Sequence, residues 1–446
     1  MFLFKGKKVS TTQDPDQDPL VAIDIGSSKI RLIAGEPAPD NKIKINYYAE
    51  KPSVGVSNST ISDLDKLTQK LAEMVREYEE SGKLFSHCSL GISGRYIDFK
   101  NRDGYATVPT HTVTELDRDN AIENASAMKL SDNQKILSSI PQDFKINEVT
   151  DIINPVGMKA SRLDVSVHVI TCSENQEQNL RSAITTLSPR FNVDHVIFNG
   201  IAAADAVLLQ EEKEMGVCLI NFGASSIDVA VYDRGKLIIS FGLDKGGINV
   251  TRDIAINHGI PLTTAEYLKL TYGIAHPMLL TDKEQGMLLG VPVNNDKKGD
   301  TVCISRKDLA YTIGVSLCDP FRQISGRLER LNNGNKIKSN FTLGAGFVIT
   351  GGVAGTQGIG SLAFNFLRPN IKGARNVRVA APRDIITDRE ELLSPECATA
   401  VGLLKLGLFL DSEEERRQKS NNERKSSNNV FSRVANWTKD WLSNEF

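Results

Sequence analysis

The sequence predicts an α/β fold made of two related domains, because one strand–turn–strand pattern occurs twice in its 446 residues. In the first copy, residues 20–34, apolar residues alternate on both sides of a small polar turn at 26–28. The second copy, residues 217–231, has the same layout around a turn at 223–226. A third strand-like stretch, 347–354, contains two adjacent glycines. We therefore expect two duplicated mixed sheets flanked by helices, with a ligand held between them.

The two turns are suited to binding phosphate groups. Glycine permits positive φ and a close backbone approach, serine adds a hydroxyl group without bulk, and successive backbone N–H groups in such a turn form a concave site for an anion. A single turn of this kind is common in ordinary hairpins, and the second copy is what favours a nucleotide held between two halves. The residues that we expect to hold phosphate are Gly26, Ser27, Ser28, Lys29, Gly223, Ala224, Ser225 and Ser226.

A carboxylate stands directly before the first turn, at Asp24. Mg²⁺ keeps several of its waters and takes few protein ligands, so one carboxylate can hold it through water. We therefore expect Mg²⁺ near Asp24. The third strand ends in Gly351 and Gly352, which let the backbone approach a flat ligand such as adenine.

Composition argues against several classes of protein. The 53 basic and 55 acidic residues give a net charge of −2, so no overall field would attract nucleic acid or an anionic membrane. The six cysteines are scattered, which argues against a metal site or disulfide framework and favours a reducing cytoplasm. No apolar run reaches the length of about 18 residues that a transmembrane helix needs. Residues 1–8 lack the apolar core of a signal peptide.

Periodic signals predict the elements between these motifs. Apolar residues at helical spacing over 62–78 predict an amphipathic helix that ends near Gly82. A second helix is expected from about Glu115 to Met128, with Thr114 as its N-cap. Further helices are expected over 174–188, 200–211, 250–257 and 304–331 and from Pro261 onward, strands over 89–93, 191–198 and 236–241, and mostly irregular structure over 244–249 and 275–303.

The C-terminal part of the chain has the pattern of a membrane-binding tail. Residues 411–429 contain no apolar side chain, which predicts a flexible linker. Over 430–446 the apolar residues, including both tryptophans of the chain, fall on one face of a helix, as in helices that lie in the bilayer interface. The expected membrane contacts are Phe431, Val434, Trp437, Trp441, Leu442 and Phe446. The alternative is a helix that docks on its own domain or in a partner's groove.

Four further stretches narrow the family. They read LGISGRY (90–96), INPVG (153–157), VHVITC (167–172) and TAVGLL (399–404). Together with the three turns and the tail, they make the chain similar to FtsA, a family of bacterial cell-division proteins in the actin, sugar-kinase and heat-shock chaperone superfamily. The resemblance covers roughly residues 18–410 and the extreme C-terminus.

The resemblance implies an actin-like two-domain fold with an inserted α+β subdomain and a C-terminal amphipathic helix. The expected divisions are a disordered leader (1–18), domain 1 (19–85, 171–203 and 384–410), an inserted FtsA-type subdomain (86–170), the core of domain 2 (204–250 and 331–383), a small subdomain (251–330), a flexible linker (411–429) and the membrane-targeting helix (430–446).

The resemblance also implies ATP and Mg²⁺ as ligands. In the family, an acidic and a basic residue at the positions of Glu266 and Lys269 contact the ribose hydroxyls. Two such residues three apart on a helix are also an ordinary surface ion pair, worth little on its own. Gly351 and Gly352 would lie on the adenine side.

The implied partners are other division proteins. The insert would contact later division membrane proteins and the next subunit of a head-to-tail filament. The small subdomain would bind the C-terminal peptide of the tubulin-like protein FtsZ, with Arg306 and Lys307 facing acidic residues of that peptide. The tail would hold the assembly on the cytoplasmic face of the inner membrane at the division septum. An apolar triplet at 2–4 leaves open a second membrane contact.

Two other functions are compatible with parts of the sequence. A small-molecule kinase needs a carboxylate base in the cleft, and the sequence offers no clear one. PilM, the soluble actin-like adaptor of type IV pilus machines, lacks this C-terminal helix. A chaperone would need a substrate-binding domain, for which no residues remain.

The second turn departs from the superfamily pattern. The usual aspartate is replaced by Asn221, and Ala224 and Ser225 replace small glycines. An amide supplies no carboxylate charge to Mg²⁺ or to a water molecule. We therefore expect ATP binding to persist and hydrolysis to be very slow or absent.

Overall fold

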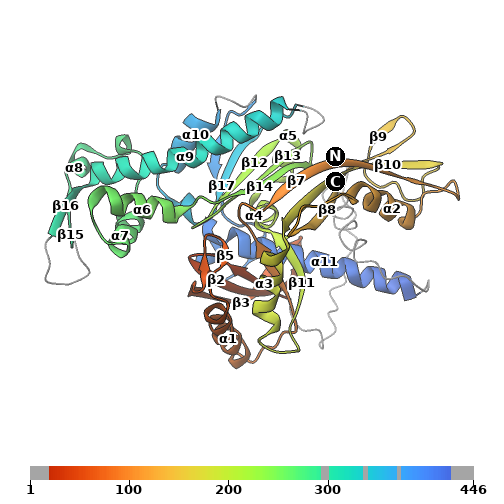
Figure 1. Cartoon of the computed structure of the whole chain (residues 1–446), viewed down its shortest axis with the longest axis horizontal. Helices are drawn as coiled ribbons and strands as arrows, with labels where there is room; N and C mark the ends of the chain where they lie inside the picture. The colour runs from red at the N-terminus through yellow and green to blue at the C-terminus, as the bar shows by residue number, and fades with distance from the viewer. Residues whose placement is uncertain (1–19, 293–300, 335–339, 369–372, 423–446) are drawn as a thin grey trace.

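Two halves, each built on its own sheet, make up most of the computed structural model, and an inserted subdomain and a small helical subdomain lie at opposite ends of its long axis (Figure 1). The structure describes residues 20–292, 301–334, 340–368 and 373–422. The predicted leader (1–18) and membrane helix (430–446) lie outside these residues.

The first half contains a six-stranded sheet in the order β11-β6-β1-β2-β3-β19. Its strands are β1 (Val21–Ile25), β2 (Lys29–Ala38), β3 (Lys42–Pro52), β6 (His87–Ile92), β11 (Asn192–Phe198) and β19 (Ile385–Ile386). Helix α11 packs on β1, β2 and β6 and against α4, which also contacts β12 and β13 of the second half, while α1 packs against α3. The helices are α1 (Leu64–Glu80), α3 (Glu174–Thr185), α4 (Asn199–Val207) and α11 (Ala398–Asn422), and the short hairpin β4 (Val56–Ser57) and β5 (Thr60–Ile61) precedes α1.

The second half contains a five-stranded sheet in the order β14-β13-β12-β17-β18. Its strands are β12 (Val217–Phe222), β13 (Ile227–Asp233), β14 (Lys236–Leu243), β17 (Gly346–Thr350) and β18 (Val377–Val379). The remaining helical elements around it are α5 (Gln210–Met215), α10 (Ile359–Leu367), and the 3₁₀ turns η2 (Gly352–Gly355), η4 (Glu390–Leu393) and η5 (Pro395–Cys397).

The two sheets repeat one another in pairing and register. Strand β1 pairs antiparallel with β2 and parallel with β6, and β12 pairs antiparallel with β13 and parallel with β17. Asp24 faces Arg31 across the first hairpin, and Asn221 faces Asp228 across the second. The predicted duplication of mixed sheets flanked by helices is confirmed.

The inserted subdomain is a sheet in the order β7-β10-β8-β9 with α2 on it. Its elements are β7 (Asp98–Thr107), α2 (Glu115–Ser126), β8 (Gln134–Ile146), β9 (Val149–Ile152) and β10 (Arg162–Ser173). As expected, Thr114 caps α2, and Asp117 completes a capping box.

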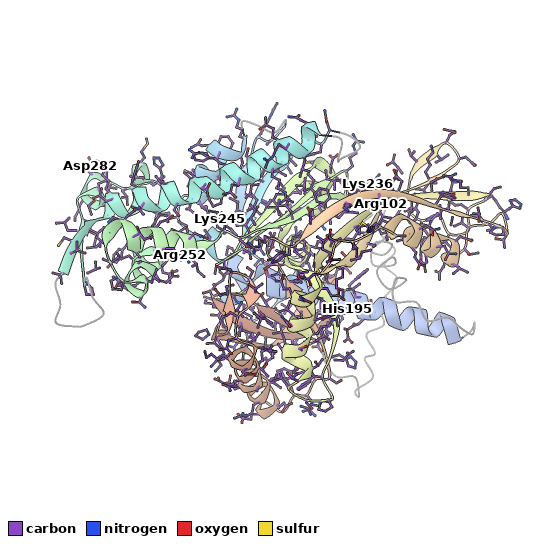
Figure 2. All side chains as sticks on the ribbon, viewed as in Figure 1. Arg102, His195, Lys236, Lys245, Arg252 and Asp282 are labelled. Carbon is purple, nitrogen blue, oxygen red and sulfur yellow. The ribbon has the colours of Figure 1, made fainter. Side chains whose placement is uncertain are left out.

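The insert interrupts the first half in sequence but packs along β14, the edge strand of the second sheet. Its side chains hydrogen-bond to β14 at three points: His168 to the Ser240 hydroxyl (2.8 Å), Asn101 to the Ile238 carbonyl (2.9 Å) and Gln142 to the Leu237 carbonyl (2.7 Å). At the start of the strand, Lys236, which is labelled in Figure 2, pairs with Asp151 at 2.6 Å. Burial lowers the pKa of His168 to about 3, so the ring is neutral in this contact at physiological pH.

The small subdomain is more ordered than the sequence suggested. Residues 275–303 were expected to be mostly irregular, but they contain most of a two-stranded hairpin, because alternating apolar residues such as Leu289, Val291 and Ile304 pack inward. The loop expected over 244–249 is shorter, since α6 begins at Gly247. The elements are α6 (Gly247–His258), α7 (Leu262–Tyr272), η1 (Pro277–Leu279), α8 (Asp282–Gln285), β15 (Leu288–Pro292), β16 (Thr301–Ser305) and α9 (Arg306–Asn333).

The predicted flexible linker is wrong for residues 411–422, which continue α11 to Asn422. His195 Nε2 lies 2.9 Å from the Asp411 carboxylate. This polar contact holds the helix at the residue where the linker was expected to begin. Glu, Arg, Gln and Lys dominate the next residues and are strong helix formers. Extending an existing helix also avoids the cost of nucleation. Residues 423–429 of the predicted linker lie outside the described residues.

Close packing of α4 on α11 generates a test of the fold. A Cβ atom at Gly402 would lie 1.7 Å from the Ala202 carbonyl oxygen, whereas a Cβ at Gly326 in α9 would meet nothing within 4 Å. Gly→Ala ordinarily stabilises a helix by about 0.5–1 kcal/mol. We expect that gain for Gly326→Ala, and a loss of about 1–3 kcal/mol from overpacking for Gly402→Ala. Denaturant unfolding of both variants measures the difference, and stabilisation by Gly402→Ala would contradict the helix contact.

Candidate nucleotide site

A cavity of about 380 Å³ lies between the two halves, a volume within the range of small-molecule sites. The structure brings to this cavity all the residues expected to hold the nucleotide and Mg²⁺. These residues are Asp24, Gly26, Ser27, Ser28, Lys29, Gly223, Ala224, Ser225, Ser226, Glu266, Lys269, Gly351 and Gly352. Segments separated by more than 300 residues in sequence therefore share one site.

The two glycine turns close in the same way and touch each other. The Gly26 N–H donates to the Lys29 carbonyl at 3.1 Å, and the Gly223 N–H donates to the Ser226 carbonyl at 2.9 Å. The hydroxyl groups of Ser27 and Ser225 lie 2.5 Å apart, so the two halves meet at the tips of their turns.

Two serines that the sequence analysis did not single out extend this contact. Ser59 Oγ lies 3.0 Å from Ser225 Oγ, and Ser93 Oγ lies 3.1 Å from Ser226 Oγ. Both serines line the cavity. Ser93 falls within the LGISGRY stretch, which was noted only for its family resemblance, while Ser59 sits in the tight β4–β5 turn with positive φ and had no comparable signal.

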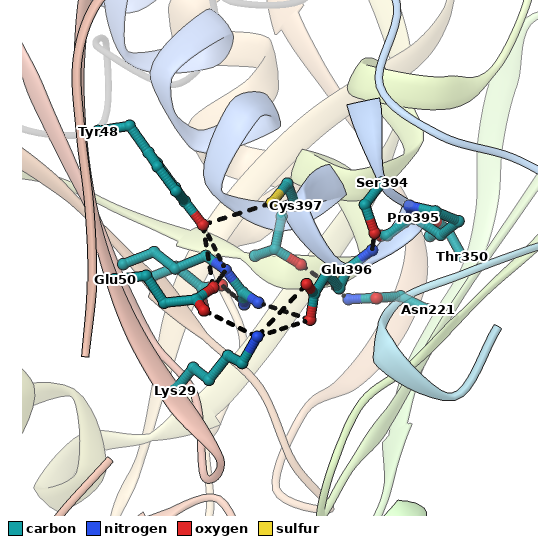
Figure 3. A network of polar contacts seen from close by, with 12 residues as sticks. Lys29, Tyr48, Glu50, Asn221, Thr350, Ser394, Pro395, Glu396 and Cys397 are labelled. Carbon is teal, nitrogen blue, oxygen red and sulfur yellow. Dashed lines mark hydrogen bonds and ion pairs between the residues drawn. The ribbon is translucent and has the colours of Figure 1, made fainter. Parts of the chain in front are cut away.

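An ion-pair network occupies the end of the cavity beside the first turn (Figure 3). The Lys29 ammonium lies 2.8 Å from Glu50 and 3.2 Å from Glu396, and the Arg31 guanidinium lies 2.9 Å from Glu50 and 3.0 Å from Glu396. Partial burial opposes the charge on Lys29, but the two carboxylates outweigh it and raise its pKa. Lys29 is therefore charged and already paired in this structure. Arg31 and Glu396 line the cavity and were missed from the sequence.

Two carboxyl groups in the lining are almost fully buried. Asp24 and Asp228 are 6% and 2% exposed. Burial raises the pKa of both, although the Arg31 guanidinium, 3.8 Å from Asp24, works in the opposite direction there. Asp228 Oδ1 and the Asn199 side-chain oxygen, also in the lining, have no hydrogen-bond partner.

These oxygen atoms fit a hydrated Mg²⁺, which binds oxygen ligands and would offset the cost of burying the carboxyl groups. Within the described ranges, no group of three or more His, Cys, Asp or Glu residues forms a conventional metal centre. Asp228 was missed, yet it occupies in the second copy the place that Arg31 occupies in the first, so aligning the two copies could have found it.

Asn221 is part of the cavity wall. Its Nδ2 donates to Thr399 Oγ1 at 3.1 Å. Its Oδ1 lies where a side chain at Gly351 would clash, since a Cβ there would be 2.7 Å away. Gly351 also has φ of +89°, which favours glycine. The backbone at Gly352 is open, because a Cβ there would meet no atom within 4 Å.

The opposite end of the cavity pairs Glu266 with Lys269 at 2.7 Å. Lys269 also donates to the Gly247 carbonyl at 3.1 Å and to the Thr251 hydroxyl at 2.8 Å, so this ion pair is anchored to α6. Apolar side chains continue the lining beyond it: Val250, Leu270, Ile313, Leu317 and Val353. The cavity therefore has a polar end suited to phosphates and a mostly apolar end suited to a base.

Several expected sites lie elsewhere. Arg306 and Lys307 begin α9 and do not line the cavity. Arg306 pairs with Glu284 at 2.8 Å and is largely buried, whereas Lys307 is exposed. The expected membrane contacts Phe431, Val434, Trp437, Trp441, Leu442 and Phe446 lie outside the described residues. In the described part of the chain, no helix has the length and apolar character needed to span a bilayer.

Comparison with known proteins identifies the family. The model described as "SHS2 domain inserted in FTSA" matches residues 94–171, and the model "Cell division protein FtsA" matches residues 218–402. The cell division protein FtsA of Neisseria meningitidis serogroup B is 30% identical over 95% of this chain and 98% of its own length.

Solved structures show the same fold. A PilM–PilN type IV pilus biogenesis complex matches with a TM-score of 0.58 at 16% identity, over 87% of this chain and 98% of the other. MreB5 of Spiroplasma citri bound to ADP matches with a TM-score of 0.52 at 12% identity, over 92% of this chain and all of the other. The expected actin-like fold is therefore confirmed. With the sequence matches over nearly the whole chain, this places the protein in the FtsA family of cell division proteins.

Proposed function

We propose that this chain is an ATP-binding, actin-like adaptor that assembles on the cytoplasmic face of the inner membrane at the division septum and tethers FtsZ filaments there. The observation that best supports the proposal is that two equivalent glycine turns meet across one cavity. Membership in a family of cell division proteins favours this function over a pilus adaptor, for which only the fold is similar.

In this proposal the triphosphate lies between the turns at 26–29 and 223–226. Asp24, assisted by Asp228, would hold Mg²⁺ through water, and that cation would neutralise charge on the phosphates. Glu266 and Lys269 would bind the ribose, and Gly351–Gly352 would face the adenine. The open backbone at Gly352 and the apolar side chains beside Lys269 support this orientation.

The assembly functions rest on the family and on the sequence of the tail. Head-to-tail contacts between subunits would form the filament, and the insert would contact later division membrane proteins. The small subdomain would bind the FtsZ C-terminal peptide. Because Arg306 is held by Glu284, exposed Lys307 is the better placed of the two expected cations to meet an acidic residue.

Asp228 provides a test of the site. Replacing it by Asn removes a buried acid whose pKa is raised in the folded state. As pH rises, this carboxyl ionises in the unfolded chain at a lower pH than in the folded chain. The wild type therefore loses stability with rising pH. We expect Asp228→Asn to raise the free energy of unfolding by about 1–3 kcal/mol at neutral pH. This gain should shrink as pH falls toward about 4, the ordinary pKa of Asp. Denaturant unfolding across this pH range measures it.

The same substitution should weaken Mg²⁺-dependent ATP binding by about 10–100-fold, the usual loss when a group supporting a metal site is removed. Titration calorimetry with ATP and Mg²⁺ measures this. A variant that is both more stable and a weaker binder fits a functional carboxyl group. Unchanged ATP affinity would exclude Asp228 from the site, and no binding by the wild type would refute the nucleotide function.

Hydrolysis is expected to be slow, because Asn221 supplies no carboxylate. We expect turnover well below about 1 s⁻¹, the low end of ordinary enzymes. Asn221→Ala should leave a residual rate of the same order, because the side chain supplies no carboxylate to lose. Phosphate release measured beside ATP binding on the same preparation tests this. Turnover at ordinary enzyme rates that Asn221→Ala abolishes would contradict it.

The tail is tested by co-sedimentation with vesicles of mixed zwitterionic and anionic lipid, with and without ATP. The chain ending at Asn422, which keeps α11 complete, should stay in the supernatant, whereas the full chain should pellet, and more so with ATP if assembly adds avidity. Replacing one apolar side chain of the expected membrane face by Trp441→Glu should weaken binding about tenfold or more.

Ser443→Glu is the matched control, because it adds the same charge to the polar face of the predicted helix. It should change binding little. Since positive and negative residues balance over 430–446, binding should also depend weakly on salt. Equal losses from the two substitutions would indicate that added charge, rather than lost apolar burial, weakens binding. Failure of the full chain to pellet would favour a partner-binding helix.

A further inference from the structure

The segment 394–399, which we call the linking segment, contacts both halves of the cleft (Figure 3). On the second half, the Pro395 carbonyl accepts hydrogen bonds from the Gly351 N–H and the Thr350 hydroxyl, both at 3.0 Å. On the first half, Glu396 pairs with Lys29 and Arg31. The linking segment then continues directly into α11, and α11 is the last element before the C-terminal tail in the sequence.

The described lining of the cavity has no spare positive charge. Its three cations are Lys29, Arg31 and Lys269. Each already pairs with a carboxylate at 2.7–2.9 Å. Four carboxyl groups also line the cavity: Asp24, Asp228, Glu266 and Glu396. A nucleotide phosphate that pairs with a cation at the first turn therefore competes with a carboxylate that already holds this cation.

Of the two carboxylates that pair with Lys29, Glu396 is the one that a phosphate can displace. The Lys29 ammonium is 2.8 Å from Glu50 but 3.2 Å from Glu396, so the contact with Glu396 is the longer one. Glu396 lines the cavity, whereas Glu50 does not. Arg31 is almost buried and also holds Glu50, which fixes that carboxylate behind the site.

We infer that a nucleotide phosphate takes Lys29 from Glu396, so that Glu396 sets nucleotide affinity and transmits occupancy of the cleft to α11. This inference rests on the proposed binding of ATP. Glu396 acts here as a positioning residue, because its effect passes through Lys29. Its carboxylate competes with the phosphate for Lys29, and its backbone belongs to the linking segment. Release of the Lys29–Glu396 pair leaves the linking segment bonded to Gly351 and, through Arg31, to β2, but no longer to the first turn.

The test is ATP binding by Glu396→Gln in the presence of Mg²⁺. This variant keeps the shape and loses the competing charge. We expect it to bind ATP about three- to tenfold more tightly than wild type, the size expected of a partly exposed ion pair. Glu391→Gln is the matched control, since Glu391 is exposed, pairs with Arg389 at 3.4 Å and does not line the cavity. It should leave affinity unchanged.

A double-mutant cycle separates competition from a structural effect. Lys29→Met should weaken ATP binding, and in that background Glu396→Gln should no longer tighten it. A structural role for Glu396 predicts weaker binding on its loss and no dependence on Lys29. Unchanged or weaker binding by Glu396→Gln, or the same tightening with Lys29 removed, would overturn the inference.

Hydrogen exchange over residues 394–410 tests the transmission to α11. In the wild type, ATP should change exchange in this segment. In Glu396→Gln, the nucleotide-free protein should already show the exchange of the ATP-bound wild type. ATP binding without any change in this segment would overturn the transmission to α11. Absence of ATP binding in every variant would instead refute the proposed function on which the inference rests.

Discussion

The cleft depends on the linking segment, residues 394–399, where the chain passes between the two halves for the second time. Each half is built on a continuous sheet, and the halves share apolar packing where α4 lies on β12 and β13. At the cavity, however, they meet through a few polar groups. Beside the serine contacts between the turns, Pro395 bonds to β17, Thr399 to Asn221 on β12, and Glu396 to the first hairpin. Polar contacts of this kind can exchange with ligand or water at modest cost, whereas apolar core contacts cannot. The polar contacts at the cavity can therefore respond to a ligand while the apolar packing of α4 on β12 and β13 stays in place.

Burial of two carboxyl groups in the site lowers the stability of the folded protein. Asp24 and Asp228 lie almost out of water, and Asp228 Oδ1 has no hydrogen-bond partner. Burial raises the pKa of both carboxyl groups, which reflects the cost of ionising them there. A structure selected only for stability would replace at least Asp228 with an uncharged residue. Its retention in the cavity wall is understandable if a cation and phosphate complete the site.

The sequence predicted the parts of the fold and site that depend on local pattern. Alternating apolar residues around Gly26 and Gly223 gave both hairpins, and the duplication brought their turns to one cavity. It did not predict Glu396, Ser59 or Asp228, because their places depend on contacts made across the fold or on register within a sheet. The error over 411–422 has a different cause: absence of apolar residues predicts a lack of core contacts, but it does not prevent a helix from extending beyond a core.

The position of the insert constrains how the cleft can open. It is covalently part of the first half, yet it is hydrogen-bonded along β14 of the second, from Lys236 to Ser240. Because His168 stays neutral and buried in that contact, mild changes of pH do not loosen it. A rotation of the halves must therefore bend the connections at the ends of β6 and β10 or break the contact with β14. The linking segment ties the halves on the other side of the cleft, through contacts that include ion pairs at the cavity. Of the two ties, only the linking segment presents charged groups to the cavity, and it is therefore the one through which a nucleotide can act directly.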